Sequence, residues 1–124
     1  MKELVEEVFI GKWKSFKVFK HSGKVHLHTI KEYCEFNFDC DKLLTIRNIE
    51  KGSAAILATT NKWAISLKDR RHYLDILLPK LRYEVITINH TTMVIDDMVS
   101  GEKTFFTKED LWQSRLDSNK EIII

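Results

Sequence analysis

The chain has 124 residues, of which 44% are hydrophobic and 31% are charged. This composition provides enough apolar side chains for one core and excludes an intrinsically disordered chain. Lys and Arg total 20 against 18 Asp and Glu, and the net charge of +2 gives no reason to expect a nucleic-acid partner. Four Gly and one Pro exclude a collagen-like or linker-dominated chain. We expect a single domain over residues 1–124.

The N-terminus lacks the pattern of a targeting signal. Its first seven residues include three Glu and one Lys, and no apolar stretch approaches the about 20 residues of a membrane-spanning helix. We therefore expect a cytoplasmic protein with no membrane partner. A signal peptide removed before this chain begins is the alternative.

Two cysteines, Cys34 and Cys40, lie six positions apart. On one extended segment their Cα atoms would be roughly 20 Å apart, whereas a disulfide needs them within about 7 Å. We predict two free thiols, which fits a reducing compartment.

Helical spacing occurs only near the ends of the chain. Residues 2–8 can form one or two turns, and residues 8–107 alternate between apolar and polar side chains, with short polar turns between segments. A bulge is expected near Lys14 and Ser15, where the apolar phase changes, and Pro79 should end a strand because it cannot donate to an inner ladder. About nine strands are expected, over residues 8–20, 25–38, 43–50, 54–59, 63–67, 72–78, 82–88, 93–98 and 102–106.

The connections are too short for the crossover helices that parallel strands need, so the sheet should be an antiparallel meander. Such a sheet hides its apolar face by closing into a barrel or folding into a sandwich, and sequential hairpins favour an up-and-down barrel. Thr107 and Asp110 have the spacing of a capping box, which predicts a helix through Leu111 and Leu116. The predicted fold is all-β, with eight or nine strands and short terminal helices.

The first strand contains Phe9-Ile10-Gly11-Lys12-Trp13-Lys14 after a short acidic turn. This run resembles the Gly-x-Trp start of the calycins, the superfamily of lipocalins and fatty-acid-binding proteins. Residues 36–52 and 83–102 are similar to small bacterial lipocalin-like domains. The resemblance implies a calycin-like barrel whose Trp13 closes one end, and non-enzymatic binding of a small apolar molecule.

Lipocalins usually place an Arg from the last barrel strand over this Trp, but here that strand offers only Lys103 and Lys108. Arg115, in the expected terminal helix, could reach Trp13 as a cation–π contact. The resemblance therefore implies barrel closure by Gly11, Trp13 and Arg115.

Apolar side chains on the expected inward face are the candidates for ligand binding. Large aromatic residues both line and fill small barrels, so a packing role in the core is the alternative for each. The candidates are Phe36, Phe38, Trp63, Ile65, Leu74, Ile76, Tyr83 and Val85.

The sequence His26-x-His28-x-x-x-Glu32 has the spacing of half a cupin metal motif, but the second half is missing. We therefore expect a polar strand end, with no metal and no cofactor. Asp75 would have a raised pKa inside the barrel, although the outer face is the more ordinary place for it. The chain contains no Gly-x-Ser-x-Gly sequence, phosphate-binding loop or Cys-x-x-Cys sequence, so no catalytic residue is predicted.

Charge is unevenly distributed along the chain. Residues 8–31 include six Lys and no Asp or Glu, whereas residues 96–110 are acidic. If the first strand pairs with the last, opposite charges meet across that seam. The alternative is a basic face for phosphate groups, with Phe16 and Phe19 as stacking platforms.

The chain ends on three Ile residues, which we expect to dock after a turn at residues 117–120. Docking on its own barrel would leave a monomer, and docking on a second copy would make a homodimer. The predicted function is non-enzymatic binding of a small apolar molecule. The alternatives are a protein-interaction module with a filled barrel, or an enzyme that uses the barrel interior.

Overall fold

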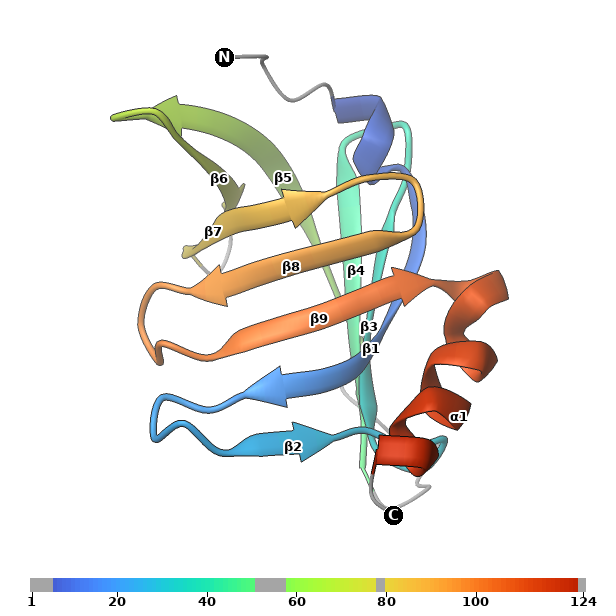
Figure 1. Cartoon of the computed structure of the whole chain (residues 1–124). Helices are drawn as coiled ribbons and strands as arrows, with labels where there is room; N and C mark the ends of the chain where they lie inside the picture. The colour runs from blue at the N-terminus through green and yellow to red at the C-terminus, as the bar shows by residue number, and fades with distance from the viewer. Residues whose placement is uncertain (1–5, 51–57, 78–79, 123–124) are drawn as a thin grey trace.

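A computed structural model describes residues 6–50, 58–77 and 80–122 (Figure 1). Strands dominate it, and helical structure is confined to the 3₁₀ turns η1 (Glu6–Phe9) and η2 (Glu109–Leu111) and the helix α1 (Trp112–Ile122). The strands are β1 (Gly11–Phe19), β2 (Val25–Leu27), β3 (Tyr33–Phe38), β4 (Leu43–Ile49), β5 (Ala58–Lys68), β6 (Arg71–Ile76), β7 (Leu81–Ile88), β8 (Thr92–Asp97) and β9 (Lys103–Lys108).

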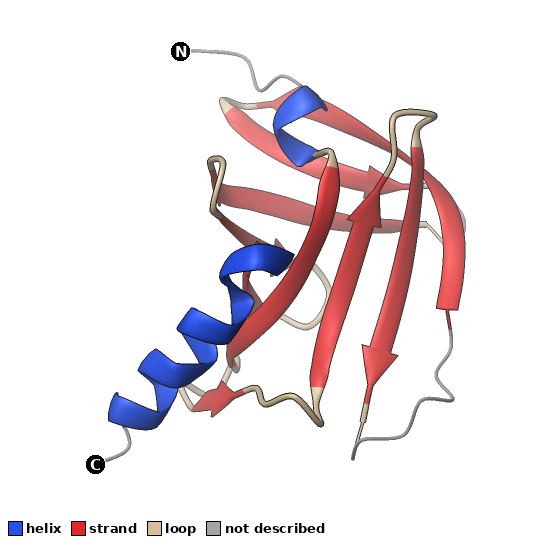
Figure 2. Ribbon diagram, turned by 90° about the vertical axis from the view of Figure 1, so that its right-hand side faces the viewer, coloured by secondary structure: helices blue, strands red, loops and turns tan. Residues whose placement is uncertain are grey.

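The strands form one antiparallel sheet that closes on itself. Its order is β2-β1-β3-β4-β5-β6-β7-β8-β9, and β9 pairs back with β1. The closed ring contains eight strands, while β2 pairs only with β1 and lies beside the ring (Figures 1 and 2). The all-β up-and-down barrel predicted from the sequence is confirmed.

A bulge in β1 decides how its neighbours are arranged. The pairing of β1 with β9 shifts register between Ser15 and Lys17, close to the position predicted from the apolar phase. Before the bulge β1 pairs with β3, and after it β1 pairs with β2. The sequence predicted one long strand over residues 25–38, but the structure has two, β2 and β3. Each pairs with β1 on a different side of the bulge.

Ser15 fixes the bend from inside. It is fully buried, and its hydroxyl oxygen accepts a hydrogen bond from the Cys34 backbone N–H at 2.7 Å and shares another with His28 Nδ1 at 2.6 Å. Its carbonyl oxygen accepts a hydrogen bond from Trp112 Nε1 at 2.9 Å. One residue thus holds β3, the chain leaving β2, and α1 against β1.

Other strand boundaries also differ from the prediction. The segments expected over residues 54–59 and 63–67 share one strand, β5, which begins at Ala58 in the described part of the chain. Residues 54–57 and Pro79 lie outside the described residues, so a strand beginning at residue 54 and a strand end at Pro79 stay predictions.

Trp13 belongs to the barrel core near the start of β1, beside Phe9 of η1. Its side chain is fully buried, and its Nε1 donates a hydrogen bond to the Phe9 carbonyl oxygen at 2.8 Å. Phe9, Phe38 and Trp63 pack beside one another, with ring centroids 5.0–5.8 Å apart. These aromatic side chains fill this end of the barrel.

The cation over Trp13 is Lys108 and not Arg115, which corrects the sequence-based assignment. Lys108 Nζ lies 4.3 Å from the Trp13 ring centroid and donates a hydrogen bond to the Ile10 carbonyl oxygen at 2.6 Å. Gly11 has a φ of +126°, and a Cβ on it would lie 2.6 Å from Lys108 Nζ. Glycine at position 11 therefore provides both the backbone conformation and the space for the ammonium group.

Arg115 lies elsewhere because α1 packs along the outside of β1 and β9 instead of across the barrel end (Figures 1 and 2). Its guanidinium carbon is 5.4 Å from the Phe16 ring centroid, and its NH2 nitrogen donates to Thr92 Oγ1 at 3.3 Å. Trp112 and Leu116 of α1 bury Phe16 between helix and barrel.

The C-terminal helix begins and ends differently from the prediction. Thr107 is not an N-cap: it is fully buried in β9, and its hydroxyl donates to the Thr91 carbonyl oxygen at 2.7 Å. Residues 117–120 are helical and form no turn, because α1 continues to Ile122. Ile123 and Ile124 lie outside the described residues, so docking of the tail stays a prediction.

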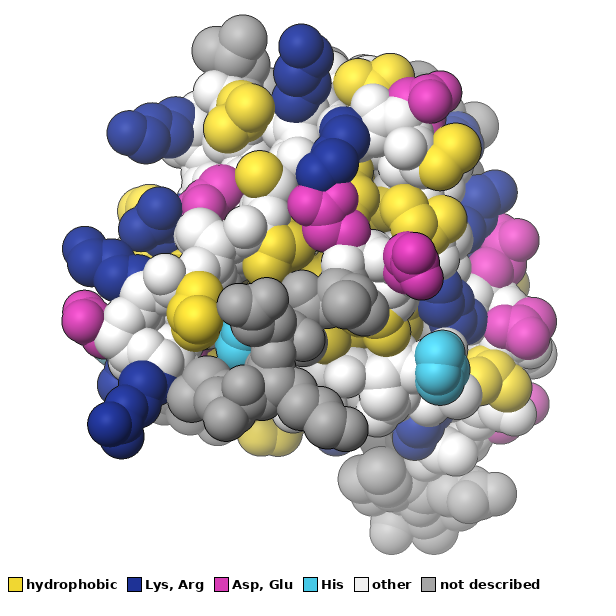
Figure 3. Space-filling model, turned by 90° about the horizontal axis from the view of Figure 1, so that it is seen from above, with side chains coloured by type: hydrophobic (Ala, Val, Ile, Leu, Met, Phe, Trp, Pro, Cys, Tyr) yellow, Lys and Arg dark blue, Asp and Glu magenta, His cyan; other side chains and the backbone are white. Residues whose placement is uncertain are grey.

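Opposite charges meet across the β1–β9 seam, as predicted for a closed barrel. Glu109 Oε2 forms ion pairs with Lys12 Nζ at 3.6 Å and Lys14 Nζ at 3.3 Å. Lys20 Nζ forms another with Glu102 Oε2 at 3.3 Å. Lysines of the basic first strand therefore pair with Glu102 and Glu109, which flank β9. On the face seen from above, side chains of both charges are mixed with hydrophobic ones (Figure 3).

We predict that Trp13→Ala lowers the free energy of unfolding by about 3–5 kcal/mol, because it leaves a cavity in a fully buried site and removes a hydrogen bond. Urea titration followed by circular dichroism measures this change. Leu67→Ala is the control, since Leu67 is 51% exposed and should cost less than about 0.5 kcal/mol. Equal losses in the two variants would contradict a structural role for Trp13.

Candidate functional site

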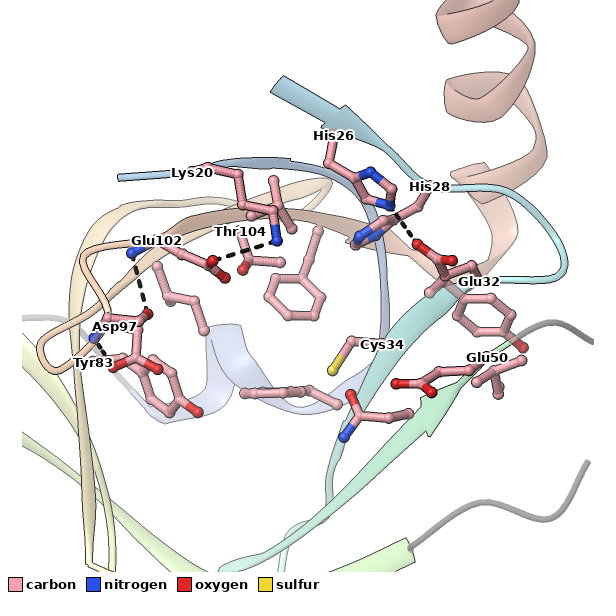
Figure 4. Close-up of a pocket in the computed structure, with 18 residues that line it drawn as sticks. Lys20, His26, His28, Glu32, Cys34, Glu50, Tyr83, Asp97, Glu102 and Thr104 are labelled. Carbon is pink, nitrogen blue, oxygen red and sulfur yellow. Dashed lines mark hydrogen bonds and ion pairs between the residues drawn. The ribbon is translucent and has the colours of Figure 1, made fainter. Parts of the chain in front are cut away.

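A pocket of about 530 Å³ opens at the end of the barrel opposite Trp13 (Figure 4). It lies where β1 has left β3 and paired with β2, so the bend at Ser15 shapes one wall. Its lining comes from strands far apart in the sequence: Val18, Lys20, His26, His28, Glu32, Tyr33, Cys34, Phe36, Asn48, Ile49, Glu50, Tyr83, Ile95, Asp97, Ser100, Glu102, Thr104 and Phe106.

The floor of the pocket is apolar and largely aromatic. Phe36, Ile95 and Phe106 are almost completely buried and belong to the barrel core. The Phe36 ring centroid lies 4.8 Å from that of Phe106 and 6.0 Å from that of Tyr83. An apolar body entering the pocket would therefore meet ring faces and edges.

Polar groups replace apolar ones toward the mouth, strand by strand. Side chains two positions apart on a strand face the same side, so each inward row can be followed outward from the core. On β8 the row runs from Met93 through Ile95 to Asp97, and on β9 it runs from Phe106 through Thr104 toward Glu102. On β4 it runs from Leu44 and Ile46 to Asn48, and Glu50 follows at the same spacing.

Charged side chains form the rim, and two of the four carboxylates are paired. Lys20 Nζ lies 3.3 Å from Glu102 Oε2. His26 Nε2 hydrogen-bonds Glu32 Oε1, and this contact lowers the pKa of Glu32. Asp97 Oδ1 accepts hydrogen bonds from the backbone N–H groups of Val99 at 2.8 Å and Ser100 at 3.2 Å, which fixes the β8–β9 turn.

Burial keeps three titratable groups of the pocket uncharged. It lowers the pKa of His28 to about 4, with a further contribution from His26. It raises the pKa of the Cys34 thiol to about 12, so this thiol is not a reactive thiolate at neutral pH. It also raises the pKa of Tyr83 to about 12, with Asp97 adding to the effect, so the phenol stays protonated.

The eight ligand-binding candidates from the sequence all belong to the barrel core or pack against it, but the structure separates them. Phe36 and Tyr83 line the pocket. The other six lie deeper or nearer the closed end and fill the barrel: Phe38, Trp63, Ile65, Leu74, Ile76 and Val85. Ligand binding by any of the eight remains a prediction.

His26, His28 and Glu32 are close together, yet they are not arranged around a common point for a metal. His28 Nδ1 is engaged by Ser15, while His26 faces Glu32. Within the described ranges, no group of three or more His, Cys, Asp or Glu side chains could hold a metal ion.

Asp75 lies outside this pocket, on the outer face of β6. It accepts hydrogen bonds from Arg82 Nε at 2.7 Å and Ser66 Oγ at 2.8 Å. Neighbours Leu74 and Ile76 point into the core, so Asp75 is not the interior carboxylate considered from the sequence. Both cysteines are free, as predicted, with Cys34 in the pocket and Cys40 exposed.

Phe16 does not serve as an open stacking platform, because it is 5% exposed beneath α1. Phe19 is more exposed, but Lys17 Nζ lies over its ring at 5.4 Å and over that of Phe105 at 4.6 Å.

Sequence reasoning missed four charged residues of the pocket rim: Lys20, Glu50, Asp97 and Glu102. The signal was present in the alternation: following the inward rows of β1, β8, β9 and β4 outward in steps of two reaches Lys20, Asp97, Glu102 and Glu50. Which rows converge on one mouth depends on the closure of the barrel, which the alternation by itself does not give.

A scan against protein-family models finds no match, and a search of curated protein sequences finds none either. Among solved structures, the chain is similar to a lipocalin-like protein from Bacteroides uniformis ATCC 8492, with a TM-score of 0.56 and 16% sequence identity. The match covers 82% of this chain and 98% of the other. At this identity the likeness shows the fold, which is lipocalin-like. Among the described helices, none has the length and apolarity to span a membrane.

We predict that His28 makes stability depend on pH. Its pKa is about 4 in the folded chain against an ordinary 6.5, so between these values the unfolded chain binds a proton that the folded chain does not. Stability is then greatest above pH 6.5 and falls toward pH 4, by on the order of 2 kcal/mol from this group. Urea titrations across this pH range measure the effect.

His28→Asn tests the assignment, because Asn can still hydrogen-bond Ser15 but does not titrate. Its free energy of unfolding should depend less on pH than that of the wild type, whereas His90→Asn, on an exposed turn, should leave the dependence unchanged. Identical pH dependence in wild type and His28→Asn would rule out His28 as the cause.

Proposed function

We propose that this chain is a non-enzymatic binding protein that takes the apolar body of a small molecule into the open end of its lipocalin-like barrel. The observation that carries the proposal is the pocket of about 530 Å³ with Phe36, Ile95 and Phe106 as its floor. Small-molecule pockets typically have volumes of about 300–1,000 Å³, with mostly apolar linings and a few polar groups that orient the ligand.

The polar groups of this pocket are placed to orient a ligand. The Tyr83 phenol stays protonated and can donate a hydrogen bond near the floor. Thr104 and Asn48 line the walls between floor and rim. The ligand that fits is therefore amphipathic, with an apolar body inward and a polar end at the mouth.

Two observations favour binding over catalysis. Burial raises the pKa values of Cys34 and Tyr83 to about 12, so both stay protonated and neither is activated as a nucleophile or base. Ser15, the hydroxyl next to His28, is fully buried, so a substrate in the pocket does not reach it.

A protein-interaction module is the second candidate, and one surface favours it. Leu77, Met98 and Val99 are 48–89% exposed and lie along a groove on the outside of the barrel. The open-end pocket, however, is not filled by side chains as that alternative requires. We also propose a cytoplasmic location, supported by the two free thiols.

Filling the pocket with a side chain tests the proposed function. The probe is 2-(1-naphthyl)ethanol, an uncharged amphipathic molecule whose binding is measured by calorimetry and naphthyl fluorescence. Thr104→Trp places an indole in the pocket and should weaken binding by about tenfold or more, with little change in melting temperature.

Thr60→Trp is the matched control, because Thr60 is exposed on the outer face and hydrogen-bonds Thr45 there. It should bind the probe like the wild type. A wild-type chain that does not bind, or a Thr104→Trp variant that binds equally well, would refute the proposed function.

A further inference from the structure

We infer that the open-end pocket selects ligands with a cationic end, such as an organic amine or quaternary ammonium group on an apolar body. This inference rests on the proposed function and specifies the chemical class of its ligand. Three features of the same cavity carry it: the charge of its rim, the ion pair of the one lysine in its described lining, and the aromatic character of its floor.

The rim is acidic although the chain is basic. The described lining of the pocket includes four carboxylates and one lysine, so it carries a net charge of −3 at pH 7 when histidines are counted as neutral. The whole chain has a net charge of +2, so the pocket has the opposite sign. This local excess gives the cavity a negative potential that attracts cations and repels carboxylate ligands.

The one lysine does not offset that charge for a ligand. Lys20 Nζ is held 3.3 Å from Glu102, so an anionic ligand would have to compete with this carboxylate. His28 stays neutral because burial and His26 lower its pKa to about 4.

Two carboxylates remain available to a ligand. In the part of the chain that the structure describes, no Lys, Arg or His side chain pairs with Glu50 or Asp97. Asp97 Oδ1 accepts the turn N–H groups, which fixes the carboxylate at the β8–β9 turn, where Asp97 lines the pocket (Figure 4).

The floor favours a cation as well. The Phe36 ring centroid lies 4.8 Å from that of Phe106 and 6.0 Å from that of Tyr83, and aromatic faces attract cations through their quadrupole. A weakly hydrated ammonium group can thus keep favourable electrostatics while its apolar substituents contact the floor. A carboxylate would lose hydration there without a cation to replace it.

The test compares three probes with one naphthyl body: 2-(1-naphthyl)ethylamine as the cation, 2-(1-naphthyl)ethanol as the neutral form and 1-naphthylacetate as the anion. In calorimetry at pH 7, the dissociation constant of the amine should be about tenfold lower than that of the alcohol. The naphthylacetate anion should bind most weakly. Added salt should weaken binding of the amine and leave that of the alcohol nearly unchanged.

Asp97→Asn removes one charge while keeping the oxygen that accepts the turn N–H groups. It should weaken amine binding about fivefold and change alcohol binding much less. Asp110→Asn is the control, because Asp110 is exposed outside the pocket and its loss changes the total charge equally. Thr104→Trp should abolish binding of both probes, which locates them in the pocket.

The outcomes separate the two proposals. Alcohol binding that Thr104→Trp removes, without a preference for the amine, supports the proposed function and overturns the cation inference. An amine preference that Asp97→Asn and Asp110→Asn reduce equally also overturns it, because the effect is then one of total charge. If none of the three probes binds, both proposals fail.

Discussion

Ser15 holds the bend of β1 by hydrogen bonds to three separate parts of the chain. Its hydroxyl engages the Cys34 backbone and the His28 ring, and its carbonyl accepts the Trp112 indole N–H. A closed antiparallel ring needs strands that bend and coil, and a bulge provides this at the cost of unpaired backbone groups. Here a buried serine satisfies those groups, so β1 can pair with β9 along its length and divide its other edge between β3 and β2.

The two ends of the barrel follow from that bend. Before it, β1 carries Gly11 and Trp13 into an end that Phe9, Phe38 and Trp63 fill. Lys108 completes this end: its ammonium covers the Trp13 ring and binds the Ile10 carbonyl, in a space left open by Gly11. After the bend, β1 turns away from β3, and the interior opens into the pocket. One strand therefore closes one end of the barrel and opens the other.

Charge is distributed to match this arrangement. The lysines of β1 that face outward, Lys12 and Lys14, pair with Glu109 across the seam, which secures closure. Lys20, at the far end of the same strand, lies at the mouth and pairs with Glu102. The basic segment is thus neutralised by the acidic end of the chain, while Glu50 and Asp97 leave the mouth acidic. A basic chain can in this way contain an acidic pocket.

Alternation of apolar and polar residues and short turns predicted most of the strands and the antiparallel barrel. The distribution of charge predicted that opposite charges meet across the seam between the first and last strands. These features are local, or follow once the first strand lies beside the last. The tertiary structure decided that residues 25–38 split into two strands, that Lys108 and not Arg115 covers Trp13, and that Thr107 lies in a strand. It also decided which polar residues share one mouth. Each of these depends on contacts between residues distant in sequence, and alternation along one strand carries no information about which distant strand lies opposite.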